Sequence, residues 1–170
     1  KVYLQANVRG LSRRVCGAEA LSRWLDPKYG MIYPGVFIPI LEKILKIHFL
    51  DLYVFREICK NIGARLKSKE IVFPVSLNFS RLDFNIGDFL DQLEKIVNEY
   101  AVPKSLLHIE ITESVVMHNE GYMKFVVKKM HELGYQVWMD DFGSGYSSLN
   151  LLKEFEFDTF KIDMRFLSDM

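Results

Sequence analysis

Apolar and polar residues follow different rhythms along the chain, and each rhythm predicts a type of element. Positions 2–8 and 14–24 suit two extended segments joined by a polar turn, which predicts an N-terminal β-hairpin. The segment 26–30 is rich in turn-forming residues and is expected to be a loop. Two helices are expected next, one opened by Pro34 and one over 51–66, because their apolar residues recur every three or four positions.

From residue 71 onward, predicted strands and helices alternate. Strands are expected at 71–79, at 106–112, around Trp138 and at 159–163, and helices at 86–100, 122–133 and 146–155. Pro74 falls inside the first of these strands and would remove one ladder hydrogen bond. Gly134 follows a helix at a position that glycine commonly occupies. This alternation predicts parallel strands with crossover helices in a single α/β domain.

Composition and charge exclude several classes of partner. The 170 residues are 49% hydrophobic, and 22 basic residues balance 22 acidic ones, as in an ordinary globular domain. Without a basic stripe or a polybasic tract, no DNA or RNA polymer and no membrane contact is expected. Charged residues interrupt the apolar region 36–66, which therefore cannot span a bilayer. We expect a cytoplasmic domain, alone or as the cytoplasmic part of a membrane-anchored protein.

Neither the cysteines nor the histidines form a pattern that indicates catalysis. Cys16 and Cys59 lie far apart without metal-ligand spacing, so reduced, buried thiols are expected. None of the four histidines stands with a serine or cysteine in a triad-like context, and we expect them in the core or on the surface.

The stretch 136–148 carries the most distinctive chemistry. An apolar strand leads directly into Asp140 and Asp141, and two glycines follow. Adjacent carboxylates repel each other, and a divalent cation such as Mg²⁺ or Mn²⁺ would offset that repulsion. An acidic helix N-terminus would explain the same two residues, since negative charge is favourable there. A dinucleotide-binding loop is a poor interpretation, because Ser148 replaces the third glycine of that fingerprint.

Polar side chains end four successive predicted strands. They are Asn78, Glu110, Asp140 with Asp141, and Lys161 with Asp163. The carboxyl ends of parallel strands share one edge, which is where α/β folds bind ligands. Carboxylates with one amide and one lysine, and without a histidine partner, favour a divalent-metal site for phosphate chemistry.

Six motifs occur in a fixed order that resembles a known family. They are Glu19-Ala-Leu21 with Arg23-Trp24, Phe37-Ile-Pro39, Ser76-Leu-Asn78-Phe-Ser80, Glu110-Ile-Thr-Glu-Ser114, the run from Asp140 to Ser148, and Lys161-Ile-Asp163. Together they resemble the EAL domain, the family of bacterial cyclic di-GMP phosphodiesterases. The resemblance implies an α/β fold, a modified TIM-like (β/α)8 barrel with an antiparallel first strand. It also implies hydrolysis of cyclic di-GMP to the linear dinucleotide pGpG.

The resemblance further implies a role for each matching residue. Glu19, Asn78, Glu110 and Asp140 would ligate one Mg²⁺ or Mn²⁺ ion, and Asp141, with Asp140 bridging, would help hold a second. Lys161 would lie beside the attacking water and the scissile phosphate. Glu113 would fix the loop after Asp141. The substrate-contacting positions would be Gln5, Leu21 and Arg23, with Arg23 reaching a phosphate.

The chain departs from the family pattern at four points. Ala6 follows Gln5 where proline is usual, Ser144 stands between the two loop glycines where threonine is usual, and the customary glycine near Leu45 is absent. The sequence also stops at Met170, before two further strand–helix units and a glutamate of the second metal site. A complete barrel needs about 250 residues. We therefore expect residues 1–170 to be the first three-quarters of an EAL domain and an incomplete barrel.

Three functions are compatible with these features. The first is an active phosphodiesterase completed by a segment beyond Met170 in the parent protein. The second is a catalytically inactive EAL domain that acts as a cyclic di-GMP receptor or a protein-interaction module. The third is a hydrolase of another phosphoester on the same barrel. The resemblance also suggests fusion to a sensory or GGDEF-type domain, and it leaves a homodimer open.

Overall fold

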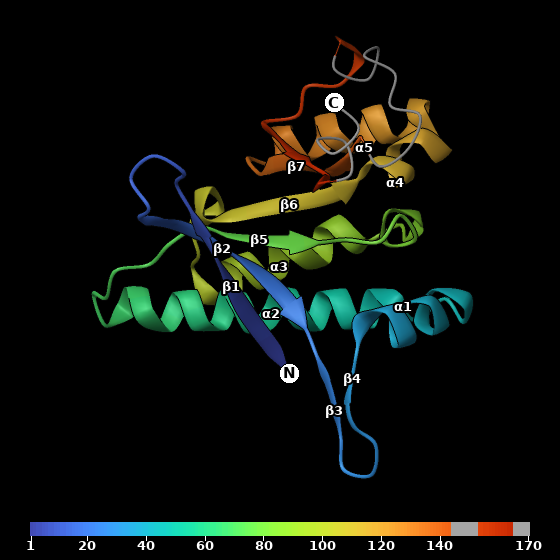
Figure 1. Ribbon diagram of the computed structural model, residues 1–170. Coiled ribbons are helices and arrows are strands. Elements are labelled where there is room, and N and C mark those ends of the chain that lie inside the picture. Colours follow the sequence, from blue (N-terminus) through green and yellow to red (C-terminus); the bar gives the residue numbers. More distant parts are fainter. Residues whose placement is uncertain (144–152, 165–170) are drawn as a thin grey trace.

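A six-stranded sheet forms the centre of the computed structural model, which describes residues 1–143 and 153–164 (Figure 1). Its strand order is β1-β2-β5-β6-β7-β8. The strands are β1 (Val2–Val8), β2 (Val15–Ser22), β5 (Val75–Asn78), β6 (Leu107–Thr112), β7 (Gln136–Phe142) and β8 (Thr159–Ile162). β1 is antiparallel to β2, and every other neighbouring pair is parallel. The α/β fold is thus confirmed as an open part of a TIM-like barrel with an antiparallel first strand.

Helices follow the strands and cover one side of the sheet. They are α1 (Pro34–Lys43), α2 (Ile47–Lys67), α3 (Phe89–Tyr100), α4 (Glu113–His118) and α5 (Glu120–Glu132), with short 3₁₀ turns η1 (Asp83–Asn85) and η2 (Lys104–Leu106). α2 and α3 lie together below the sheet in Figure 1, and α5 lies beside β7. Gly134 follows α5 with φ +91°, which confirms the predicted glycine stop.

A small hairpin projects from the body of the molecule. It consists of β3 (Trp24–Asp26) and β4 (Gly30–Ile32), joined by the loop that the sequence predicts (Figure 1). Asp26 Oδ1 accepts hydrogen bonds from the backbone amides of Lys28 and Tyr29 at 2.8 and 3.0 Å, which stabilises the turn. The sequence pattern predicted the loop but not these two strands.

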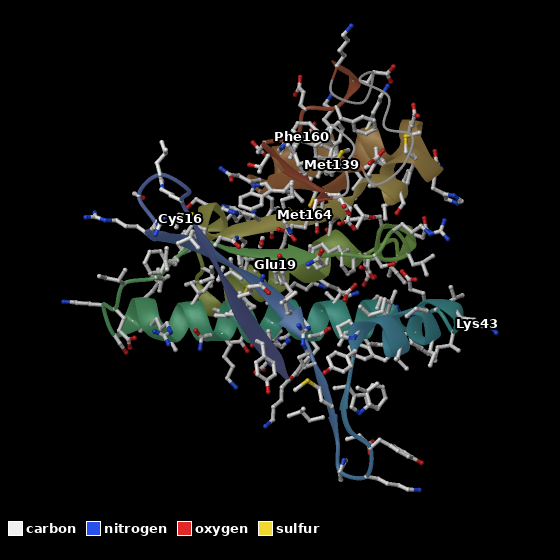
Figure 2. The ribbon with its side chains drawn as sticks, viewed as in Figure 1. Cys16, Glu19, Lys43, Met139, Phe160 and Met164 are labelled. Atoms are coloured by element: carbon white, nitrogen blue, oxygen red, sulfur yellow. The ribbon has the colours of Figure 1, made fainter. Side chains whose placement is uncertain are left out.

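The central strands present one apolar face and one polar face. Leu77, Ile109 and Met139 are at most 1% exposed and belong to the core packed against the helices. Figure 2 labels Met139 and Phe160, which are register partners on β7 and β8. Side chains alternate along a strand, so the residues between these apolar positions lie on the opposite face. That face carries the polar residues discussed below.

Three individual elements differ from what the sequence pattern predicts. β5 begins only at Val75, so Pro74 precedes the strand, where its carbonyl accepts a hydrogen bond from Ala18 N at 2.9 Å. The predicted apolar stripe of α1 is not a core face, because Phe37 is its buried residue while Val36 and Ile40 are more than half exposed. The short helix α4 was not predicted; it begins at Glu113, directly after β6.

Some expectations concern residues outside the described ranges. The predicted helix 146–155 falls largely there, as do Ser144 and Ser148. Within residues 1–143 and 153–164, no helix has the length and apolar character needed to cross a membrane.

Candidate active site

Three carboxylates from three strands converge on the polar face of the sheet. Glu19 on β2, Glu110 on β6 and Asp140 on β7 each offer an oxygen, and these oxygens all lie within 4.8 Å of one another. Figure 2 labels Glu19 on β2, beside β5. Strand register explains why Glu110 and Asp140 converge. Asp140 pairs with Thr112, which lies two residues beyond Glu110 on the same face of β6.

The Lys161 ammonium lies in contact with all three carboxylates. Lys161 Nζ is 3.0 Å from Glu19 Oε2, 2.9 Å from Glu110 Oε2 and 3.1 Å from Asp140 Oδ2. Burial lowers the pKa of Lys161, but the attraction of these carboxylates is larger in sum and raises it above its ordinary value. Lys161 is therefore protonated at neutral pH, and one positive charge faces three acidic groups.

Glu110 is the most deeply buried member of this group. Its side chain is 0% exposed, and its Oε1 has no hydrogen-bond partner among the described residues. Burial raises the pKa of Glu110, and the Lys161 ammonium opposes that rise. A buried carboxylate oxygen without a partner is costly, and an added cation at this position would satisfy it.

Asn78 joins the carboxylates from the end of β5. It pairs in register with Glu110, and its Nδ2 donates a 3.0 Å hydrogen bond to Glu19 Oε1. The predicted convergence of polar strand ends thus holds for Asn78, Glu110, Asp140 and Lys161, and Glu19 from β2 joins them.

A bulge in β7 sets Asp141 apart from Asp140. Between two consecutive register pairs, β7 contains one residue more than β8. Asp141 lies in this bulge and has a φ of +55°. Its backbone N–H donates to Asp140 Oδ1 at 2.9 Å. Left-handed backbone is uncommon outside glycine, although aspartate tolerates it better than most residues. β7 therefore continues through both acids and ends at Phe142, so both lie at its C-terminal end, as the sequence pattern predicts.

Glu113 contacts the segment that follows Asp141. It is buried, with 3% exposure, and its Oε2 accepts a 2.9 Å hydrogen bond from the backbone N–H of Gly143. Gly143 has φ +90°, a conformation that favours glycine. This contact is compatible with the loop-fixing role that the family resemblance implies for Glu113, and the role itself stays a prediction.

A cavity opens beside the acidic group. It has a volume of about 330 Å³, and its lining includes Leu21, Arg23 and Asn78. Arg23 Nη1 donates to the Ser22 carbonyl at 2.8 Å. Gln5, the third predicted substrate contact, lies on β1 directly opposite Glu19 in the antiparallel register. Leu21 and Arg23 therefore line this cavity, whereas Gln5 lies beside Glu19 and does not line it.

The remaining candidate groups lie elsewhere in the fold. Cys59 is buried and Cys16 partly buried, and both are free thiols, as expected. The His108 ring lies against Trp138 with a centroid distance of 4.4 Å and an interplanar angle of 35°, and burial lowers the pKa of His108. Asp163 follows β8, where its backbone N–H donates to the Phe142 carbonyl at 3.0 Å.

Comparison with known proteins assigns the chain. The whole of residues 1–170 matches the EAL domain family. The chain belongs to the EAL domain family. Among solved structures, a complex of the MucR phosphodiesterase with cyclic di-GMP superposes with a TM-score of 0.90 at 30% identity, covering 99% of this chain and 68% of that one.

Relatives of known sequence agree with this assignment. The signalling protein YkoW of Bacillus subtilis is 35% identical over 159 residues, which are 93% of this chain and 20% of that protein. MucR of Pseudomonas aeruginosa, a bifunctional diguanylate cyclase and cyclic di-GMP phosphodiesterase, is 30% identical over 169 residues, which are 99% of this EAL chain and 25% of that protein. The EAL chain thus spans about a quarter or less of the length of these two relatives.

Sequence reasoning missed one polar group near the site. Glu42, Asp51 and Asp83 surround Ser80, just after β5, and Glu42 and Asp51 also line the cavity. No spacing in the sequence indicates this group, because its members come from α1, α2 and η1.

Proposed function

We propose that this EAL domain forms the catalytic part of a metal-dependent phosphodiesterase that hydrolyses cyclic di-GMP to pGpG. The observation that carries the proposal is the convergence of Glu19, Glu110, Asp140 and Lys161 at one rim of the sheet. The cavity lined by Leu21 and Arg23 lies alongside and offers room for a ligand. Similarity to MucR, a bifunctional diguanylate cyclase and cyclic di-GMP phosphodiesterase, supports the same substrate.

The residues of the acidic group suit a divalent cation. The Lys161 ammonium faces three carboxylates, and the buried Glu110 Oε1 has no partner among the described residues. Glu19, Asn78, Glu110 and Asp140 would hold one Mg²⁺ or Mn²⁺ ion, and Asp140 with Asp141 would help hold a second, since such ions prefer oxygen ligands. When bound, a pair of such ions supplies hydroxide near neutral pH and stabilises charge on the attacking and leaving oxygens.

The chain's own side chains bind and orient the phosphodiester. Hydrolysis adds water across one P–O3′ bond, so that oxygen joins phosphorus and a proton ends on the released 3′-hydroxyl. Lys161, with its raised pKa, is suited to donate hydrogen bonds to phosphate oxygens and not to accept a proton. Arg23 would bind a phosphate, and Gln5 and Leu21 would contact the rest of the substrate. Glu113 would keep the segment at Gly143 in place.

Product analysis with the full-length protein tests this proposal. We expect pGpG to form from cyclic di-GMP in the presence of Mg²⁺ or Mn²⁺, and EDTA to abolish the reaction. Binding of cyclic di-GMP without turnover would instead indicate a receptor. If the protein neither binds nor hydrolyses cyclic di-GMP, both functions are contradicted and only the fold assignment stands.

A further inference from the structure

Three acidic side chains converge on Ser80, apart from the Glu19–Glu110–Asp140 group. The Ser80 hydroxyl donates to Glu42 Oε1 at 2.7 Å. Its backbone N–H donates both to Asp83 Oδ2 at 2.9 Å and to Asp51 Oδ2 at 3.3 Å. Asp51 Oδ2 and Asp83 Oδ2 therefore accept from the same N–H donor, which places the two carboxyl groups side by side.

Sharing one donor favours a proton on the pair. Two ionised carboxylates side by side repel each other, and protonation of one of them removes that repulsion. Asp83 is 0% exposed, and its Oδ1 has no partner among the described residues. None of the ion pairs found in the described part of the chain involves Asp51, Asp83 or Glu42. A second charge on the partly buried Asp51, beside a charged and fully buried Asp83 and without a cation, would be unfavourable.

The charged groups around the pair favour the same protonation. Burial and the neighbouring Asp83 raise the pKa of Asp51 well above its usual range. Burial raises the pKa of Asp83 to about 6, and Glu42 on α1 adds to that rise. The basic residue that lines the adjacent cavity, Arg23, directs its Nη1 to the Ser22 carbonyl.

We propose that Asp51 and Asp83 hold one proton between them in the folded protein and act as positioning residues that fix the Ser80 turn after β5. Two consecutive backbone amides follow Asn78. Phe79 N donates to the Glu110 carbonyl at 3.1 Å, and Ser80 N donates to the acid pair. Together they hold the end of β5, and with it the Asn78 side chain that contacts Glu19. This positioning of Asn78 for catalysis rests on the proposed function; the shared proton does not.

A permanently neutral replacement tests the shared proton. In Asp51→Asn, the amide oxygen can accept from Ser80 N while the amide nitrogen donates to Asp83, as a protonated acid would. Carboxyl groups with raised folded-state pKa values stabilise at low pH, and that stabilisation is lost as pH rises through those pKa values, about 6 for Asp83 and well above the usual range for Asp51. The melting temperature of Asp51→Asn minus that of wild type should therefore increase by about 3 °C or more between pH 5 and pH 8.

Two comparisons make this result specific. Asp91→Asn removes an exposed carboxylate on α3. The difference between its melting temperature and that of wild type should stay constant over the same pH range. Asp51→Ala removes both the proton site and one acceptor of Ser80 N, and should melt lower than Asp51→Asn at every pH. If the difference in melting temperature between Asp51→Asn and wild type does not change with pH, the proposal is overturned.

A bound cation could neutralise the acid pair instead of a proton. Measurements in a second variant, Asp140→Asn, distinguish these two explanations. In Asp140→Asn protein, which lacks one carboxylate of the other acidic group, Mg²⁺ or Ca²⁺ should leave the melting temperature at pH 8 unchanged. Stabilisation by either ion that disappears when Asp51→Asn is added would show that a cation, not a proton, neutralises the pair.

Kinetics in the full-length protein tests the positioning role. With Mn²⁺ and cyclic di-GMP, Asp51→Ala should lower kcat about 10-fold and raise the Mn²⁺ concentration needed for half-maximal rate. Asp51→Asn should recover at least half of the lost rate, and equal rates for Asp51→Ala and wild type would overturn the role. If wild type itself shows no hydrolysis, the proposed function fails, whereas the melting experiment still decides the shared proton.

Discussion

Glu19 Oε2 and Lys161 Nζ lie 3.0 Å apart, although 142 positions separate the two residues in the sequence. Their strands, β2 and β8, are not neighbours, because β5, β6 and β7 lie between them. In a flat sheet those strands would be about 19 Å apart, at roughly 4.8 Å per step. The contact therefore depends on the curvature of a barrel-like sheet, which brings side chains on its concave face together.

Removing the Lys161 ammonium should destabilise the protein when no metal is bound. Lys161→Met leaves Glu19, Glu110 and Asp140 together without their positive partner. Lys161 is 29% exposed, so we expect a loss of about 2 kcal/mol in the free energy of unfolding, less than for a fully buried pair. Urea denaturation at pH 8 in EDTA measures this loss, and Mg²⁺ should restore part of it.

The matched control is a surface lysine. Lys124 pairs with Glu154, and both side chains are more than 40% exposed. Lys124→Met should change the free energy of unfolding by less than about 0.5 kcal/mol. If Lys161→Met without metal is as stable as wild type, the three carboxylates do not need a cation.

Glu113 should influence turnover through the Gly143 segment. Glu113→Ala removes the acceptor of the Gly143 N–H, whereas Glu113→Gln retains an oxygen at that position. We expect kcat for cyclic di-GMP to fall about 10-fold or more in the alanine variant, with partial recovery in the glutamine variant. Steady-state kinetics with each variant's melting curve separates this effect from simple unfolding. Unchanged kcat in Glu113→Ala would show that this hydrogen bond does not serve the site.

The contact of α2 with α3 should not tolerate a side chain at Gly63. A Cβ at this position would lie 2.5 Å from the Tyr100 carbonyl oxygen, which is backbone and cannot move aside easily. Gly63→Ala should cost about 1–3 kcal/mol in the free energy of unfolding. Gly35→Ala in α1 meets nothing within 4 Å and should be neutral or slightly stabilising. Equal stability of the two variants would contradict the close helix approach.

Glu110 should link the stability of the metal-free protein to pH. Burial raises its pKa, so its folded-state value lies above the unfolded one. Its contribution is therefore complete below the unfolded pKa, about 4.3, and is lost as pH rises through the folded value. Glu110→Gln, which stays neutral, should gain stability relative to wild type between pH 4 and pH 8 in EDTA.

The same glutamine variant should lose metal-dependent stabilisation, because a neutral amide is a weaker ligand than a carboxylate. Melting curves with and without Mn²⁺ measure both effects in one series. Glu120→Gln, an exposed acid at the start of α5, serves as the control and should show neither. A response of Glu110→Gln to Mn²⁺ as large as that of wild type would contradict its place among the metal ligands.

The rim of polar strand ends could be predicted because it depends on local patterns. Alternating strands and helices indicate parallel strands, and parallel strands place Asn78, Glu110 and Asp140 at one edge. The sequence motifs also suffice to indicate the family, which the full-length match confirms. Both inferences use short-range periodicity or fixed residue order, and neither needs a three-dimensional packing calculation.

Other features depend on tertiary contacts that no local pattern encodes. The bulge at Asp141 arises from the pairing of β7 with β8, and the start of β5 after Pro74 depends on pairing with β2. The acid pair of Asp51 and Asp83 joins an α2 side chain to a 3₁₀ turn 32 positions later (83 − 51). The apolar stripe of α1 predicted burial, but periodicity alone cannot say which surface a helix meets.

Metal-dependent turnover by wild type and Asp140→Asn tests the central claim most directly. Asp140 contacts Lys161, shares the acidic group with Glu19 and Glu110, and would touch both metal ions. In full-length protein with cyclic di-GMP and Mn²⁺, wild type should produce pGpG, and Asp140→Asn should lower kcat at least about 100-fold with an unchanged circular dichroism spectrum. Turnover by Asp140→Asn at the wild-type rate would contradict the assignment of this site.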